Sequence, residues 1–186
     1  VYSGGKWSDA ETLPIVNGAI SDISIKEYDG KLYVLYGVEE ESILLDADGN
    51  PMFKDSDGNA ESQKLNKYKL VRYDGTGWTT EQRIVGGDVS DVYAEFAEIN
   101  NKLQIFVLSG MEMYSVDAET KKVIDTVSFK DLRDALDVKL VQDGKNIALV
   151  WVSSGNDGPM LFATLYDQER GWSEAQQLEA ETDSNS

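Results

Sequence analysis

The chain has 186 residues, no cysteine and no histidine, and 34 acidic against 17 basic side chains give a formal charge of −17. The acidity argues against a nucleic-acid partner, because a phosphate backbone is bound by clustered Lys and Arg. The missing residue types exclude thiol nucleophiles, disulfides, thiolate zinc sites and the Ser-His-Asp triad. One domain is expected at this length, and no apolar run is long enough for membrane insertion.

A strand pattern recurs three times along the chain and predicts three units of four antiparallel strands. The first unit spans about 20–85, with strands expected at 21–28, 31–39, 67–74 and 77–85. The second spans about 88–129, with strands at 91–99, 102–109, 111–117 and 121–129. The third spans about 135–179, with strands at 135–143, 145–153, 160–168 and 171–179.

The first two strands of each unit are predicted to form a hairpin. The three copies read EYDGKLYVLYG, EINNKLQIFVLSG and VQDGKNIALVWVSSG, with an Asp-Gly or Asn-Asn turn before Lys31, Lys102 and Lys145. Such dipeptides are typical of two-residue hairpin turns because they tolerate positive φ. Both faces of these strands are largely apolar, which indicates sheets packed against other sheets.

Three segments fall outside this pattern. Residues 44–63 form a polar insertion in the first unit, residues 130–136 are expected to form one or two helical turns, and 181–186 are a flexible tail. Residues 2–13 match the fourth strand of a unit whose other strands are absent, so an orphan N-terminal edge strand is expected.

Four-stranded units repeated side by side predict an all-β, β-propeller-like fold: about three blades plus the orphan strand, in a single segment over residues 1–180. Known rings contain roughly four to eight blades. The missing blades are therefore expected from a longer parent chain or from a second copy.

The Trp-led parts read YSGGKWSDAETL, YDGTGWTTEQRI and YDQERGWSEAQQL, and the middle unit carries MYSVDAETKKVIDTVSF instead. This order resembles the sialidase-type, Asp-box-like repeat of bacterial extracellular β-propellers. The resemblance implies a propeller fold and an extracellular or cell-surface location, and no catalytic residue is carried over. A complete sialidase site is not expected, because the four arginines Arg72, Arg83, Arg133 and Arg170 lie outside the first strands.

Two groups of residues are candidate ligand sites. Trp7, Trp78 and Trp172 occupy equivalent places and either pack between blades or stack against a glycan. The insertion contains DxDGN twice, and its oxygen-bearing side chains at alternate positions are of the type that Ca²⁺ requires: Asp46, Asp48, Asn50, Asp55, Asp57 and Asn59. The alternative is a pair of Asp-Gly turns, and no cofactor is required.

The function expected from these features is non-catalytic: a binding or scaffolding propeller segment of a secreted or surface-attached bacterial protein, with a glycan or protein ligand. One alternative is part of a glycoside-processing, sialidase-like enzyme propeller completed by the missing blades. Another is a kelch-like intracellular interaction module. Carboxylates and a tyrosine such as Tyr33, Tyr36 or Tyr93 converging on the channel mouth would favour the enzyme.

Overall fold

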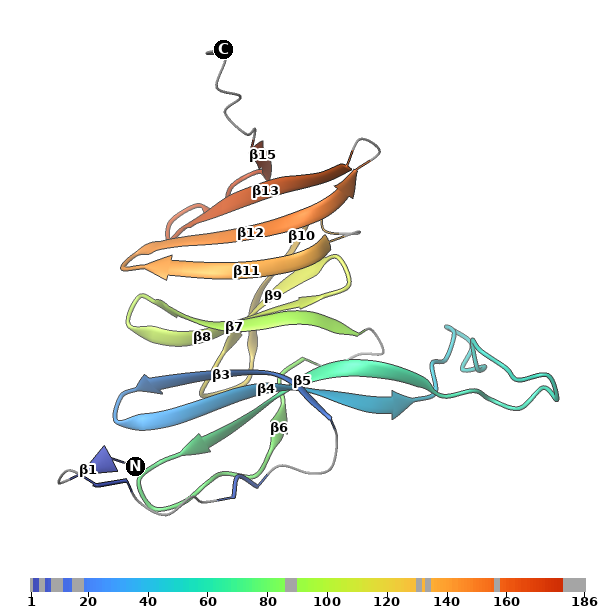
Figure 1. Cartoon of the computed structure of the whole chain (residues 1–186), viewed down its shortest axis with the longest axis horizontal. Coiled ribbons are helices and arrows are strands. Elements are labelled where there is room, and N and C mark those ends of the chain that lie inside the picture. Colours follow the sequence, from blue (N-terminus) through green and yellow to red (C-terminus); the bar gives the residue numbers. More distant parts are fainter. Residues whose placement is uncertain are drawn as a thin grey trace, which may run out of the picture.

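The computed structural model describes residues 2–3, 6–7, 12–14, 19–85, 90–129, 132, 135–155 and 158–178. Three antiparallel sheets lie stacked on one another like the blades of a propeller (Figure 1), which confirms the expected all-β fold. Among these residues, no helix has the length and apolar character needed to cross a membrane.

Each sheet is a meander of strands consecutive in the chain. Blade 1 consists of β3 (Ile20–Tyr28), β4 (Lys31–Ser42), β5 (Gln63–Tyr73) and β6 (Gln82–Arg83). Blade 2 consists of β7 (Asp91–Ile99), β8 (Lys102–Ser109), β9 (Glu112–Asp117) and β10 (Val123–Ser128). Blade 3 consists of β11 (Ala135–Asp143), β12 (Asn146–Gly155), β13 (Gly158–Asp167), β14 (Gly171–Trp172) and β15 (Gln176–Leu178), the last two both paired with β13.

Apolar side chains from facing sheets form one core between each pair of neighbouring blades. Leu35 and Leu70 of blade 1 belong to a buried cluster with Phe96 and Ile105 of blade 2. A second cluster joins blade 2 to blade 3 and contains Trp151, which is 1% exposed. Because the strands of blade 2 lie between two layers, they need apolar residues on both faces, and this explains the continuous apolar runs of that unit.

The hairpin turns of blades 1 and 2 lie at the predicted residues, and the turn of blade 3 lies one residue later than predicted. Asp29 and Gly30 have φ of 50° and 69°, and Asn100 and Asn101 have φ of 50° and 55°. Both pairs of angles fit the positive-φ turns that match the twist of a hairpin. In blade 3, Asp143 pairs with Asn146, so the turn residues are Gly144 and Lys145 rather than Asp143 and Gly144.

The expected elements outside the blades have mixed outcomes. Tyr2–Ser3 (β1) and Lys6–Trp7 (β2) pair with each other in a two-stranded ribbon, and Leu13 packs against blade 1. Of the helical turn expected over 130–136, Leu132 has 3₁₀ conformation, whereas Ala135 already begins β11; residues 130, 131, 133 and 134 lie outside the described part. Residues 181–186 lie outside the described part.

Candidate functional site at the axial mouth

The first strands β3, β7 and β11 run side by side along one edge of the stack, and each contains a bulge near its start (Figure 1). The pairing shifts register between Ile20 and Asp22, between Asp91 and Tyr93, and between Ala135 and Asp137. Asp22, Tyr93 and Asp137 each lie seven residues before the first residue of the hairpin turn. The bulges are therefore structurally equivalent, and bulges often re-aim side chains next to functional sites.

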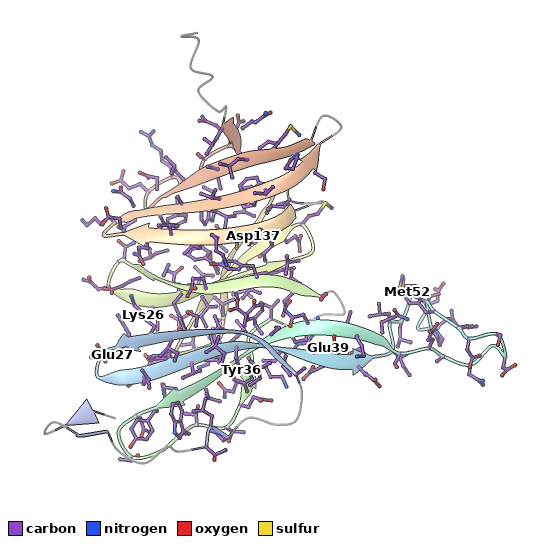
Figure 2. The ribbon with its side chains drawn as sticks, viewed as in Figure 1. Lys26, Glu27, Tyr36, Glu39, Met52 and Asp137 are labelled. Atoms are coloured by element: carbon purple, nitrogen blue, oxygen red, sulfur yellow. The ribbon has the colours of Figure 1, made fainter. Side chains whose placement is uncertain are left out.

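These bulges bring residues of all three blades around one cavity. Its volume is about 410 Å³, and we call it the axial mouth; its lining residues are Ser21, Asp22, Asn66, Tyr68, Val92, Tyr93, Asp137, Val138 and Lys139. Figure 2 shows Asp137 close to the centre of the stack. Two carboxylates, two phenol groups and one ammonium group thus meet at the same end of the inner strands.

Blade 1 holds Asp22 through two hydrogen bonds. Asp22 Oδ1 accepts from the Ile23 N–H over 2.9 Å, and Asp22 Oδ2 accepts from the Tyr68 hydroxyl over 3.2 Å. Burial, followed by the Asp22 carboxylate, raises the pKa of Tyr68, so this phenol stays protonated and remains a donor. Beside it, Ser21 Oγ donates to Asn66 Oδ1 over 3.0 Å.

Tyr93 holds the middle of the mouth and joins blade 2 to blade 3. Its hydroxyl oxygen accepts from the Leu140 N–H over 3.0 Å, and Lys139 Nζ lies 5.7 Å from the centroid of its ring. Burial raises the pKa of Tyr93 to about 12, which keeps the phenol neutral. The Tyr93 ring is therefore a fixed wall between Asp22 and Asp137.

Asp91 is not a lining residue of the axial mouth, but it contacts the backbone of the lining residue Tyr68. This residue is 3% exposed, and its Oδ2 accepts from the Tyr68 N–H over 3.0 Å. Burial raises the pKa of Asp91, although its hydrogen bonds and the nearby Lys67 and Arg83 oppose the rise. The backbone that carries Tyr68 is thus anchored by a buried carboxyl group.

The opposite end of the inner strands carries a second cavity of about 620 Å³, which includes Lys26, Glu95, Glu98, Gln142 and Lys145. Ser24 Oγ donates to Glu95, and Gln142 Nε2 donates to the Glu98 carbonyl oxygen over 2.7 Å. Figure 2 places Lys26 and Glu27 at this end of blade 1, away from Asp137. Gln142 thus bonds to backbone groups in this cavity, whereas in the axial mouth the side chains of Asp22 and Tyr68 bond to each other.

The Asp-rich insertion connects β4 to β5 and forms an arm that points away from the blades (Figure 1). Asp46 Oδ1 accepts from the N–H groups of Asp48 and Asn50 over 2.9 and 2.8 Å. Asp55 Oδ1 accepts from Asp57 and Asn59 over the same distances. The Asn50 N–H lowers the pKa of Asp46, and the side-chain amide of Asn59, followed by the Asn59 N–H, lowers the pKa of Asp55.

In the arm, the carboxylates of Asp46 and Asp55 therefore each close the turn that follows them. Across the described residues, no three Asp, Glu, His or Cys side chains group as metal ligands. The Ca²⁺ site stays a prediction.

Two of the three candidate tryptophans lie against other aromatic or apolar groups. Trp172 contacts Phe106, Phe129 and Tyr166 with ring centroids 5.4, 6.0 and 5.2 Å apart, at the joint between blades 2 and 3. Trp78 lies 5.3 Å from the Tyr73 ring and covers Val34 and Val71. The Trp7 side chain lies outside the described part, and glycan stacking by these residues stays a prediction.

Of the tyrosines named from the sequence, only Tyr93 reaches the axial mouth. Tyr33 is buried between blades 1 and 2, and Tyr36 is buried on the other side of blade 1. Sequence reasoning missed Asp22, Tyr68 and Asp137. No sequence signal marked the two carboxylates, because the expected Asp143-Gly144 turn begins six residues after Asp137, whereas the Asp29-Gly30 turn begins seven residues after Asp22.

The Asp turn is present in the middle unit as well, although the Trp segment is not. Asp117 Oδ1 accepts from the Thr120 N–H and hydroxyl over 2.7 and 2.9 Å. Asp74 and Asp167 accept from backbone N–H groups at the same point after the third strand of their blades. The turn that follows the third strand is therefore a feature of all three blades.

No family model and no curated protein sequence matches this chain. Among solved structures, the chain is similar to the GH43 protein BlXynB, a K247S mutant from Bacillus licheniformis, with a TM-score of 0.50 and 10% identity. The match covers 91% of this chain and 32% of the other, so this chain spans about a third of that neighbour. At such identity the likeness shows the fold alone, which is that of a β-propeller, and it does not single out sialidase-type repeats.

Proposed function

We propose that this chain is a carbohydrate-binding segment of a β-propeller and that the axial mouth holds the hydroxyl groups of a glycan. The convergence of Asp22, Tyr93 and Asp137, one from each inner strand, is the observation that carries this proposal. Carboxylates accept hydrogen bonds from sugar hydroxyls, whereas the ammonium group of Lys139 donates to them. The volume of about 410 Å³ lies in the range of small-ligand sites.

The geometry of the mouth supports a ligand rich in hydroxyl groups over an anionic one. Its two carboxylates outnumber the single Lys139, and no arginine is among its lining residues. An anionic ligand would meet repulsion there, while a neutral sugar would find acceptors already in place. The formal charge of −17 strengthens this preference.

The location of the protein outside the cell is part of the same proposal. The resemblance of the Asp turns and Trp-led segments to sialidase-type blades supports a secreted or surface-attached bacterial protein. Its surface acidity favours solubility in such a setting. The segment acts there as a non-catalytic binding module.

The test is glycan binding with matched charge variants. The chain is screened on an array of neutral and acidic glycans, and the affinity for the best neutral glycan is measured by calorimetry. Asp22→Asn and Asp137→Asn are each expected to weaken binding at least about tenfold, because a hydrogen bond to a charged group contributes roughly 1.5–3 kcal/mol. Asp29→Asn and Asp143→Asn remove the same charge at the other end of the same strands and serve as controls.

Two results would contradict the proposal. One is equal loss of affinity in all four variants, which would indicate a general charge effect. The other is the absence of binding to any neutral glycan on the array.

A second candidate function is glycoside processing, and a specific observation favours it. Asp22 and Asp137 come from the two outer blades and line the same mouth as Tyr93, which is the convergence expected of an enzyme. Two carboxylates on either side of a sugar are the usual machinery of glycoside hydrolysis. The GH43 neighbour is a glycoside hydrolase, which fits this candidate. Release of reducing sugar from oligosaccharides, lost in Asp22→Asn and in Asp137→Asn but kept in Asp29→Asn, would establish it. Binding without turnover would leave the first proposal in place.

A further inference from the structure

A third cavity lies between blade 1 and the turn that joins β9 to β10 in blade 2. Its volume is about 230 Å³, and we call it the interblade cavity; its polar lining residues are Arg72, Thr79, Gln82, Glu119, Thr120 and Lys121. The first three come from blade 1 and the last three from blade 2. The interblade cavity shares no lining residue with the axial mouth.

Positive charge is in excess at this cavity. Arg72 and Lys121 line it together with a single carboxylate, that of Glu119, whereas the axial mouth has two carboxylates and one ammonium group. Lys31 Nζ lies 2.8 Å from Glu119 Oε1, so this carboxylate is already paired with a cation from outside the lining. The lining is therefore cationic in a chain whose formal charge is −17.

Arg72 has donors that the protein does not use. Its Nη1 lies 3.6 Å from Glu119 Oε1, which is longer than a normal hydrogen bond. Its Nε is buried and has no acceptor among the described residues. The side chain as a whole is 24% exposed, so its outer N–H groups remain within reach of the cavity. Guanidinium donors match the spacing of oxygens in oxyanions.

Lys121 has a backbone conformation that favours glycine. Its φ is 62°, and Gly171, which occupies the same position in blade 3, has φ of 78°. Each of the two residues lies four positions after the aspartate of its turn. Non-glycine residues with positive φ are uncommon, and strained positions gather at functional sites. The lysine side chain, rather than the turn, therefore accounts for the residue at this position.

The surroundings of Lys121 do not fully compensate its charge. Burial, followed by the positive charge of Arg72, lowers the pKa of Lys121, although Asp117 and Glu119 oppose this effect. Two cations are thus held near each other at a partly buried place. An anion between them would relieve their repulsion.

Uncharged donors complete the lining. Thr79 Oγ1 accepts from the Arg72 N–H over 3.0 Å, and its own hydrogen remains available for donation. Gln82 adds a side-chain amide. These donors come from both blades and do not share one plane, which suits a tetrahedral anion better than a planar carboxylate. The volume is below the range of pockets for drug-sized ligands, so it suits a single small group.

We propose that the interblade cavity binds a sulfate or phosphate group through Arg72, Lys121 and Thr79. The group is either a free ion or an ester on a larger molecule, and the chemistry that recognises it is the same. This site does not depend on the proposed function of the axial mouth.

The experiment titrates the chain with sodium sulfate and with sodium phosphate in a calorimeter. Sodium chloride keeps the ionic strength constant, so that screening does not change during the titration. The expected result is saturable binding of one ion per chain. Glucose 6-sulfate and glucose 6-phosphate are titrated in parallel, with glucose as the blank. Tighter binding of the esters supports a group carried on a larger molecule, and equal binding supports a free ion.

Two variants remove the cations. Lys121→Gly deletes the ammonium group, and its fold is expected to persist because glycine suits the φ of this position. Arg72→Gln deletes the guanidinium group. Each is expected to weaken binding at least about tenfold, since hydrogen bonds to charged groups are the strong ones. Circular dichroism checks that both variants fold.

Lys122→Gln is the matched control. Lys122 is the exposed neighbour of Lys121, and its replacement removes the same charge without touching the lining. Its effect on affinity is expected to be less than about threefold. A loss in Lys122→Gln equal to that in Lys121→Gly would indicate a general charge effect and overturn the proposal. Absence of saturable binding for all four anionic probes would overturn it as well.

Discussion

The Tyr68 hydroxyl donates a hydrogen bond to Asp22 Oδ2 over 3.2 Å and joins the third strand of blade 1 to the bulge in its first strand. The Tyr68 ring is 3% exposed and lies in the core between blades 1 and 2. Since the core fixes the ring, the ring fixes the direction of the Asp22 carboxylate. The packing of two blades is thereby connected to the geometry of the axial mouth.

Tyr68→Phe keeps the ring and removes only this hydrogen bond. We expect the free energy of unfolding to fall by about 1 kcal/mol and the affinity for the glycan to fall with it, because Asp22 loses the group that orients it. Urea denaturation and calorimetry measure the two effects. Tyr73→Phe removes a hydroxyl that donates to the Gly75 carbonyl oxygen at an exposed turn and is the control. A drop in stability with unchanged affinity would show that Tyr68 does not orient Asp22.

The strands of this fold were predictable because hairpin chemistry and apolar periodicity agree in each unit. The strands expected at 91–99, 102–109 and 135–143 coincide with β7, β8 and β11. The expected Trp-led strand at 77–85 is short in the structure, where only Gln82–Arg83 forms β6 and Trp78 makes a single bridge to Tyr73. Trp78 lies over Val34 and Val71. Burial of this apolar face outweighs continued strand pairing in that segment.

The candidate site was harder to find, because its residues are ordinary in the sequence. Asp22 and Asp137 are two of 34 acidic residues, and no local pattern separates them from surface charges. Only the alignment of three bulges across three blades brings them to one cavity. Tertiary register of this kind is not encoded in the periodicity of a single strand.

Gly37 is predicted to be indispensable for the shape of the mouth. A Cβ atom on Gly37 would lie 2.4 Å from Ser21 Oγ and 3.2 Å from Asn66 Oδ1. Gly37→Ala therefore forces Ser21 away from Asn66, and we expect a loss of about 1–2 kcal/mol in unfolding free energy, as for other overpacked positions. Gly77→Ala, where a Cβ meets nothing within 4 Å, is the control for thermal unfolding. Equal melting temperatures for the two variants would contradict this prediction.

Lys69 is predicted to stabilise the side of blade 1 that faces away from blade 2. Its side chain is 11% exposed, and its ammonium group is shared by Glu40 and Glu81. Burial tends to lower the pKa of Lys69, but the two carboxylates outweigh it and raise that pKa. Lys69→Met leaves two carboxylates without the cation they share, and we expect a loss of about 3 kcal/mol.

The control for Lys69 is an exposed ion pair on the same sheet. Lys64 and Glu39 lie 2.8 Å apart with side chains 65% and 47% exposed, so Lys64→Met is expected to cost less than about 1 kcal/mol. Chemical denaturation of both variants gives the comparison. A loss for Lys69→Met no larger than that for Lys64→Met would show that the bridge does not stabilise blade 1.

Asp117 is predicted to make stability fall in acid. Burial tends to raise the pKa of its carboxyl group, but hydrogen bonds from Thr120 and Glu119 outweigh burial and lower that pKa below 3.8. A lowered folded-state pKa means that the ionised form stabilises the fold above the unfolded pKa, and this stability is lost as pH falls through the folded value. Asp117→Asn is therefore expected to flatten the loss of stability in acid. Urea midpoints measured from neutral pH downward check this, and parallel curves for the two proteins would contradict it.

The arm is predicted to need no calcium for the stability of the fold. Asp46 and Asp55 already accept the N–H groups of their own turns, and the arm lies apart from the cores between the blades. Removal of divalent ions with EDTA, or addition of Ca²⁺, is therefore expected to move the melting temperature only slightly. A rise of about ten degrees on adding Ca²⁺ corresponds to roughly 3–4 kcal/mol of linked binding free energy. A rise of that size, lost in Asp46→Asn and Asp55→Asn, would instead establish the arm as a calcium site.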